Sequence, residues 1–274
     1  MISIEPITPH LGAEVRGVLE PGASPKQVAI TLRQALLKHH LLVLRARILN
    51  PPEQIALARI FGEPVLFDDP KIPEYPAIFR ISNQQGEGHL NVGQHWHVDG
   101  TRTKSGTPIS IWHVIQHPAE GGDTWYANMH RAYEDLPDDL RGRVDDLVMV
   151  SESGARHALV KRHPATKRKM LYINIRLTDH VLGMSAAQSK VLLERLDEHL
   201  NDYLDRESVH YRHKWLVGDV VIGDNFSVAH KAIPTDPRFP RTLHRVTIRG
   251  GTAFWLQAAK ETNVAAQAVV DQDV

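Results

Sequence analysis

The chain of 274 residues contains no cysteine, which excludes disulfide frameworks, thiolate nucleophiles, iron–sulfur clusters and zinc fingers. It also carries no net charge, because 32 lysine and arginine residues balance 32 aspartate and glutamate residues. Proteins that bind nucleic acid mainly by charge have a basic excess, so we expect no nucleic-acid partner.

Long hydrophobic runs are missing as well. No apolar segment reaches the roughly 18 residues that a membrane helix needs. The first six residues, Met-Ile-Ser-Ile-Glu-Pro, lack the basic and apolar regions of a signal peptide. Together with the absence of cysteine, this pattern predicts a cytoplasmic protein with no membrane partner.

The composition is otherwise that of an ordinary globular protein, with 42% hydrophobic and 23% charged residues. One count is unusual, since the chain has 17 histidines. A high histidine content makes a metal site worth seeking and does not by itself establish one.

Three segments have the periodicity of amphipathic helices. Val28, Leu32 and Leu36 recur at helical spacing and predict a helix over 25–39, opened by a proline. A second helix is expected to begin at the Pro51-Pro52 pair and to end before Gly62, and a third covers 185–205.

Short β-rich runs dominate the chain from about residue 76 onward. Many short strands separated by turns favour a sandwich or a small barrel with the helices outside it. We therefore expect one mainly-β domain with flanking and inserted helices over 1–256, followed by a loose tail over 257–274. The predicted strands cover 41–44, 77–81, 94–99, 109–115, 122–128, 211–215, 220–222, 228–232 and 243–248.

The densest group of candidate functional residues lies in the predicted strand 94–99. Alternate side chains of a strand point the same way, so His95, His97 and Asp99 are expected on one face. Two imidazoles and a carboxylate on one face can bind a divalent metal. The alternative from this segment alone is a solvated strand face without any ligand.

A histidine far along the chain favours the metal site. His230 lies at the start of a late strand, after the polar turn formed by Asp224 and Asn225. Two ligands from an early segment and one histidine from a late strand give the facial arrangement of a non-haem Fe(II) oxygenase. Three open positions then remain on the iron, two for a bidentate 2-oxoacid and one for O₂. We also expect Asp224 and Asn225 to orient His230.

A 2-oxoacid with a second carboxylate needs a cation on the same inner wall. Arg241 and Arg245 are four residues apart and face the same side of a strand, and a guanidinium binds both oxygens of a carboxylate. Thr124 offers a hydroxyl to the same carboxylate. The alternatives are surface salt bridges for both arginines and a plain hairpin turn around Thr124.

Taken together and in this order, these segments resemble the taurine dioxygenase and 2,4-dichlorophenoxyacetate dioxygenase family of Fe(II)/2-oxoglutarate oxygenases. The matching segments span roughly residues 60–250. They are Trp-His-Val-Asp at 96–99, Gly-Gly-Asp-Thr at 121–124, His-Pro-Ala-Thr at 163–166, Tyr-Ile-Asn at 172–174, Gly-Asp-Val-Val-Ile-Gly-Asp-Asn at 218–225, His230, and Arg-Thr-Leu-His-Arg at 241–245.

The resemblance implies a double-stranded β-helix, or jelly roll, and a role for each candidate residue. His97, Asp99 and His230 would be the ligands of Fe(II). Thr124 and Arg241 would hold the distal carboxylate of the co-substrate 2-oxoglutarate. Arg245 would meet the anionic group of a small organic substrate, which is oxidised with O₂. Relatives of this kind are commonly dimers or tetramers, so a homo-oligomer is expected.

Two further residues, His95 and Phe67, are assigned to the substrate pocket. The substrate is expected not to be taurine. His95 is left to line the pocket or to serve the structure. In taurine dioxygenases a histidine follows the Phe-Gly-Glu segment, whereas here Leu66 and Phe67 follow it and indicate a more apolar substrate body. Asp99 excludes a halogenase of this chemistry, which needs a small residue there. Hydroxylation is favoured, with bond cleavage and desaturation left open.

Two other functions remain as alternatives. Two histidines at 95 and 97 with a distant third histidine also fit a cupin-type metal-binding protein or a zinc hydrolase, but neither needs Thr124, Arg241 and Arg245 in these places. A catalytically silent relative is less favoured, because every ligand position is kept.

Overall fold

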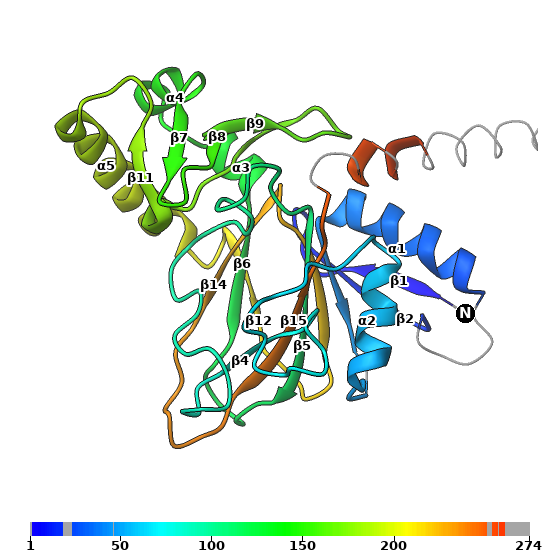
Figure 1. Ribbon diagram of the computed structural model, residues 1–274. Helices are drawn as coiled ribbons and strands as arrows, with labels where there is room; N and C mark the ends of the chain where they lie inside the picture. The colour runs from blue at the N-terminus through cyan, green and yellow to red at the C-terminus, as the bar shows by residue number, and fades with distance from the viewer. Residues whose placement is uncertain (1, 19–23, 46, 251–253, 257, 261–274) are drawn as a thin grey trace, which may run out of the picture.

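The computed structural model describes residues 2–18, 24–45, 47–250, 254–256 and 258–260, and its centre is a pair of facing β-sheets (Figure 1). Neighbouring strands of both sheets are antiparallel, except that β2 and β3 are parallel. The seven-stranded major sheet has the order β1 (Ser3–Pro6), β2 (Ala13–Arg16), β3 (Leu41–Leu44), β13 (Val220–Asp224), β5 (Ile109–Gln116), β15 (Thr242–Thr247) and β4 (Phe79–Ser82). The minor sheet has the order β12 (His210–His213), β6 (Thr124–Asn128) and β14 (Val228–Ala232).

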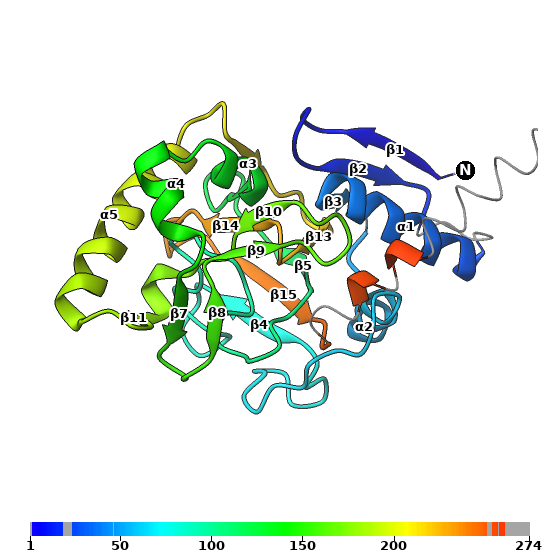
Figure 2. The ribbon, with the colours of Figure 1, turned by 90° about the horizontal axis from the view of Figure 1, so that it is seen from above.

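Two smaller sheets and the helices surround this pair. One small sheet has the order β11 (Thr178–Val181), β7 (Val148–Ser151) and β8 (Arg156–Ala158), and the other pairs β10 (Lys169–Leu171) with β9 (Val160–Arg162). The helices are α1 (Pro25–His39), α2 (Pro51–Arg59), α3 (Met129–Glu134), α4 (Asp138–Val144), α5 (Ala186–Leu204) and a 3₁₀ turn over Ile175–Leu177. Figure 2 shows α1 and α2 at one side of the molecule and α4 and α5 at the other.

The three helices predicted from the sequence form as α1, α2 and α5, whereas α3 and α4 were not predicted. Asn50 caps α2 with a reciprocal pair of hydrogen bonds, since its side chain accepts from Glu53 N at 2.9 Å while Glu53 Oε2 accepts from Asn50 N at 2.8 Å. Such a cap contributes about 1 kcal/mol. In α1, Leu32 and Leu36 are fully buried, and each buried leucine contributes about 1.5–3 kcal/mol.

The central strands of the major sheet are buried on both faces. In β5, Ile109 and Ile111 belong to the large cluster under the helices, whereas Trp112 and Val114 point to a second cluster between the two sheets. This double burial explains the continuous apolar run Leu41–Leu44 in β3. The second cluster also contains side chains of β6 and β14, so the two sheets enclose an inner space lined from both sides.

One expectation about the chain is corrected here. Residues 94–99 form no strand, because only His97 makes an isolated bridge and the rest is loop. Of the segment expected as a loose tail, residues 258–260 are helical and Ala258 is buried. Residues 257 and 261–274 of that segment lie outside the described residues.

The described residues contain no helix that is long and apolar enough to cross a membrane.

Candidate active site

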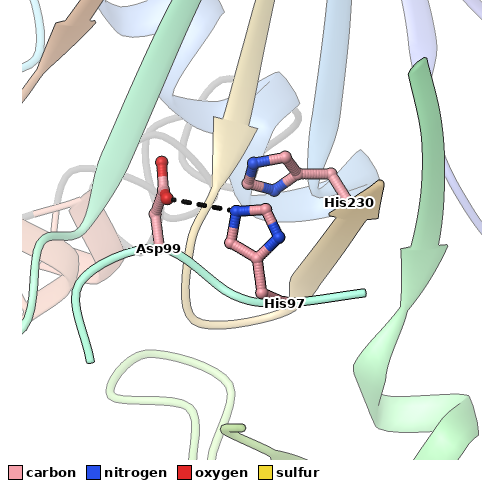
Figure 3. A group of neighbouring side chains, drawn as sticks. All are labelled: His97, Asp99 and His230. Atoms are coloured by element: carbon pink, nitrogen blue, oxygen red, sulfur yellow. Dashed lines mark ion pairs between the residues drawn. The ribbon is translucent and has the colours of Figure 1, made fainter. Parts of the chain in front are cut away.

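Three side chains from distant parts of the chain converge at one end of the inner space. One ligand atom each of His97, Asp99 and His230 lies within 4.8 Å of the other two (Figure 3). His97 and Asp99 come from the loop before β5, and His230 comes from the middle of β14. The three ligand residues predicted from the sequence are therefore neighbours in space.

The backbone brings the two histidines together. His97 N donates to the carbonyl of His230 at 3.2 Å, and His230 N donates to the carbonyl of His97 at 2.9 Å. This reciprocal pair is an isolated antiparallel bridge between the loop and β14. The sequence analysis expected a regular strand to align His97 and Asp99, but a single bridge followed by a turn does so instead.

The orientation of the His97 ring is set by its own loop. Its Nδ1 donates to the carbonyl of His95 at 2.8 Å, which leaves Nε2 free to bind a metal. Gly93 permits this arrangement, because it has a φ of +70° and a Cβ there would lie 3.0 Å from His97 Cε1.

The two carboxylate oxygens of Asp99 contact different groups. One faces the triad of His97, Asp99 and His230, and the other bonds to the major sheet. Oδ1 lies 3.6 Å from His97 Nε2, whereas Oδ2 accepts from Ser110 Oγ at 2.8 Å and from Arg245 Nη1 at 3.3 Å. Burial by itself raises the pKa of Asp99, but Arg245 and the two histidines outweigh burial and hold this pKa well below its usual range. The Asp99 carboxyl group is therefore ionised at neutral pH.

His230 is buried against aromatic side chains of both sheets. The Trp112 ring meets it edge-on with centroids 4.8 Å apart, and the Tyr126 ring lies 6.1 Å away. Burial and then the neighbouring His97 lower the pKa of His230 well below its usual range, so the ring is neutral. Its Nδ1 is buried without a hydrogen-bond partner among the described residues. Trp112 packs between the two sheets.

The donor set fits a divalent transition metal. Ligands about 2.1 Å from an octahedral ion and at right angles to each other are about 3.0 Å apart. The 3.6 Å between His97 Nε2 and Asp99 Oδ1, and the 4.8 Å within which all three ligand atoms lie, exceed this value, so the side chains would move inward to bind one ion. Two imidazoles and one carboxylate on a single face are the donors of non-haem Fe(II) oxygenases.

Arg241 and Thr124 also meet in the inner space, as the sequence predicts. Arg241 Nε donates to the carbonyl of Gly122 at 2.7 Å, and Nη2 lies 3.4 Å from Thr124 Oγ1. Trp215 Nε1 donates to the same Thr124 oxygen at 3.0 Å. Burial lowers the pKa of Arg241 to about 10, so the guanidinium keeps its charge at neutral pH. A buried cation beside a hydroxyl is a ready site for a carboxylate.

Two cavities adjoin these groups. One of about 370 Å³ contains His97, Asp99 and Arg245 in its wall, and another of about 380 Å³ has Arg241 in its wall. Val92 lies in the wall of both, so the cavities are neighbours.

The first cavity contains the residues that the sequence assigns to the substrate pocket. Phe67 lies in its wall and packs on Phe79 with ring centroids 5.0 Å apart. The Arg245 guanidinium lies 4.8 Å from the centroid of the Phe79 ring, and its buried Nε has no partner among the described residues. Leu66 is 60% exposed, so it contributes less to the wall of the substrate pocket than the sequence indicates. The Arg245 guanidinium beside the Phe67 and Phe79 rings suits a ligand that has an anionic group and an apolar body.

His95 lies in the wall of the same cavity but outside the triad. Its Nε2 donates to Asn174 Oδ1 at 3.1 Å. Burial and then the neighbouring His97 lower the pKa of His95, which favours the neutral ring. The sequence left this histidine between a pocket and a structural role, and both hold in part, because it lines the cavity and supplies the carbonyl that orients His97.

The hydrogen bonds of the polar turn before His230 go to groups other than the His230 ring, and only Asn225 reaches Asp99, through Ser110. Asp224 accepts hydrogen bonds from His163 Nε2 at 3.1 Å and from the Ser227 hydroxyl, all in the buried interior. Asn225 Nδ2 donates to Ser110 Oγ at 3.0 Å, and Ser110 in turn donates to Asp99. The expectation that Asp224 and Asn225 orient His230 is therefore wrong.

A buried lysine supports the loop that follows Asp99. Lys161 Nζ donates to His157 Nδ1 at 3.0 Å and lies 3.5 Å from the centre of the Tyr172 ring, while the Tyr172 hydroxyl donates to the carbonyl of Asp99 at 3.3 Å. His157 Nε2 donates to the carbonyl of Thr103 in the same loop at 2.9 Å. Of this group, only Tyr172 belongs to a segment that the sequence analysis singled out, and no role was predicted for it.

This lysine gives the fold a pH-dependent stability. Burial lowers the pKa of Lys161 to about 7 from 10.5, so between these values the unfolded chain binds more protons than the folded protein and folding stability rises with pH. Near pH 6, the free energy of unfolding of Lys161→Met is therefore expected to be a few kcal/mol higher than that of the wild type. This difference should shrink as the pH rises toward about 10. Denaturant unfolding across this range measures it, and a difference that does not vary with pH would contradict the assignment.

Sequence reasoning missed Ser110 and Tyr126 at the site. Ser110 gives no signal, because it is a small residue inside an apolar strand. Tyr126 follows Thr124 by two positions on the predicted strand, so alternation could have placed both on one face.

Comparison with known proteins agrees with this fold and site. A sulfate ester dioxygenase of Pseudomonas putida that depends on α-ketoglutarate is 27% identical, with 91% of this chain and 90% of the relative aligned. The α-ketoglutarate-dependent 2,4-dichlorophenoxyacetate dioxygenase of Cupriavidus pinatubonensis is 30% identical over 75% of this chain and 83% of its own. A crystal structure of a proposed α-ketoglutarate-dependent taurine dioxygenase from Burkholderia xenovorans superimposes with a TM-score of 0.76 at 30% identity, covering 91% of this chain and 90% of the other.

The jelly-roll fold predicted from the sequence is confirmed, and so is the class of enzyme, an Fe(II)- and 2-oxoglutarate-dependent dioxygenase. More particularly, the model of the taurine catabolism dioxygenase TauD, TfdA family matches residues 3–247, so the chain belongs to that family.

Proposed function

We propose that His97, Asp99 and His230 hold the catalytic Fe(II) and that Arg241 and Thr124 bind the distal carboxylate of 2-oxoglutarate. Two features of the inner space support this assignment. The three ligand side chains meet within 4.8 Å at one end of it, and the Arg241–Thr124 pair lies in the same space. A zinc hydrolase or a cupin-type binding protein needs only the first of these two features.

The protein residues prepare the reaction and the bound iron supplies its redox chemistry. In the proposed reaction 2-oxoglutarate and O₂ become succinate and CO₂, and one oxygen atom enters the substrate. Ser110 and Arg245 fix the second oxygen of Asp99, and the carbonyl of His95 fixes the His97 ring. The Trp112 ring beside His230 and the Phe67 ring beside Phe79 give the site apolar surfaces.

We propose an anionic small molecule with an apolar body as the substrate, oriented by Arg245 over the Phe67–Phe79 wall. The two relatives named above act on sulfate esters and on an aryloxyacetate, which share an anionic group and a carbon bonded to oxygen. Hydroxylation of that carbon gives a hemiacetal-type product that breaks its C–O bond. Substrates of this kind are therefore the first to test, and taurine is not expected to react.

A panel of small anions tests this proposal. Enzyme loaded anaerobically with Fe(II) is given 2-oxoglutarate, then O₂, with alkyl sulfates, aryloxyacetates or taurine, and succinate is measured. Succinate release stimulated by a member of the first two groups is the expected result. Activity supported by Zn²⁺ and independent of 2-oxoglutarate would instead favour the hydrolase.

Arg245→Met is expected to weaken binding of the substrate far more than binding of the co-substrate. The variant keeps the apolar contact with Phe79 and loses the charge, so KM for the anionic substrate should rise about 30-fold or more, as for loss of one partner of a buried charge pair. Steady-state kinetics with each ligand varied in turn measure this effect. Equal increases in both KM values would refute separate roles for Arg245 and Arg241.

The remaining expectations about the environment stay predictions. They are a cytoplasmic location, a homo-oligomeric state, and no nucleic-acid or membrane partner.

A further inference from the structure

Tyr126 occupies a position between the two groups that the proposed function uses. On β6 it stands directly opposite His230 of the neighbouring strand β14. It also follows Thr124 by two residues on the same strand, so both side chains point to the same face. The Tyr126 ring contacts Trp112 of the opposite sheet edge-on, with centroids 5.9 Å apart, and therefore lies inside the space between the sheets.

The hydroxyl of Tyr126 is unusual because it is buried without a partner. The residue is fully buried, and its hydroxyl makes no hydrogen bond within the part of the chain that the structure describes. The polar groups around it are satisfied, since Trp215 donates to Thr124 and the Tyr211 hydroxyl bonds to His213 Nδ1 at 2.9 Å. A buried hydroxyl without a partner is costly, so its retention suggests an acceptor supplied from outside the chain.

The acceptor that the proposed function places along this part of the inner space is 2-oxoglutarate. Its keto acid end belongs at the triad that contains His230, and its distal carboxylate belongs at Arg241 and Thr124. A molecule that spans these two points passes along β6 between His230 and Thr124, where Tyr126 stands.

We propose that the Tyr126 hydroxyl donates a hydrogen bond to the distal carboxylate of 2-oxoglutarate, as a third group beside Arg241 and Thr124. This inference rests on the proposed function. It makes Tyr126 a determinant of co-substrate choice, because a 2-oxoacid without the distal carboxylate has nothing to accept this bond.

Tyr126→Phe removes the hydroxyl and keeps the ring, and binding is measured by calorimetry under anaerobic conditions with Mn²⁺ in place of Fe(II). Loss of a hydrogen bond to a charged group should raise the Kd for 2-oxoglutarate about 10- to 100-fold. The Kd for 2-oxopentanoate, which has no distal carboxylate, should not change. Without any 2-oxoacid the variant should melt at the same temperature as the wild type or higher, since it no longer buries an unpaired hydroxyl.

Tyr211→Phe is the matched control. Tyr211 lies next to Tyr126 on β12, but its hydroxyl already has a partner, so this variant should melt at a lower temperature and bind 2-oxoglutarate like the wild type.

The outcomes separate this inference from the proposed function. If the wild type binds no 2-oxoglutarate in the presence of Mn²⁺, the proposed function itself fails. If the wild type binds it and Tyr126→Phe binds it equally well, the hydroxyl serves another acceptor, such as a buried water, and only the inference fails. An equal loss of affinity for both 2-oxoacids also overturns the inference, because the contact then does not involve the distal carboxylate.

Discussion

His230→Ala is expected to abolish metal binding and turnover. Loss of a residue that only orients a metal ligand lowers metal affinity about 10- to 100-fold, so loss of a ligand should exceed 100-fold. The proposed site has only three protein ligands, and the remaining pair, His97 and Asp99, cannot define one face of an octahedral ion. Anaerobic titration with Mn²⁺ and the release of succinate measure the two effects.

The effect of His230→Ala must be separated from general damage to the fold. His180 is a suitable control, because it is a partly exposed histidine outside the site whose ring pairs with its neighbour Asp179 at 2.8 Å. His180→Ala should bind metal and turn over like the wild type. Retention of metal binding and activity in His230→Ala would refute its assignment as a ligand.

Arg241→Met should raise the Kd for 2-oxoglutarate by about two to three orders of magnitude. Truncation of one partner of a buried, hydrogen-bonded charge pair costs about 2–5 kcal/mol or more, which corresponds to roughly 30- to 4,000-fold in Kd. Methionine fills much of the space of the side chain without the charge, so metal affinity should change little. Calorimetry in the presence of Mn²⁺ measures both quantities.

Arg238→Met serves as the control for Arg241→Met. Arg238 belongs to the same segment, is 81% exposed and bonds only to Asp236 in the same turn. This variant should bind 2-oxoglutarate normally. A similar loss in both variants would point to the segment as a whole and would contradict a specific carboxylate site at Arg241.

The triad could be predicted from the sequence because its chemistry constrains residue type and order. Two histidines and one aspartate match the metal preference, and a threonine between Asp99 and His230 with two arginines after His230 leaves few alternatives. The helices were predictable for a similar reason, since α1 and α2 carry both an apolar face and a proline near the start.

The local structure around the triad could not be predicted in the same way. Residues 94–99 alternate like a strand, yet a reciprocal bridge to His230 and the turn after Val98 hold them instead. That bridge depends on a partner far along the chain, which local alternation does not reveal.

The surroundings of the site were the least predictable part. Arg245 was expected to meet the substrate alone, but in the structure it also bonds to Asp99. The groups that hold Asp99 and its loop, Ser110 and Tyr172, are common residues whose role appears only when β5 and the segment before the 3₁₀ turn are packed beside the site.

Crystals grown anaerobically with Mn²⁺ and N-oxalylglycine test the central claim most directly through the anomalous signal of the metal. The account predicts one strong peak bonded to His97, Asp99 and His230, with the distal carboxylate of the analogue on Arg241 and Thr124. A metal bound elsewhere in the chain, or no metal between these three side chains, would contradict it.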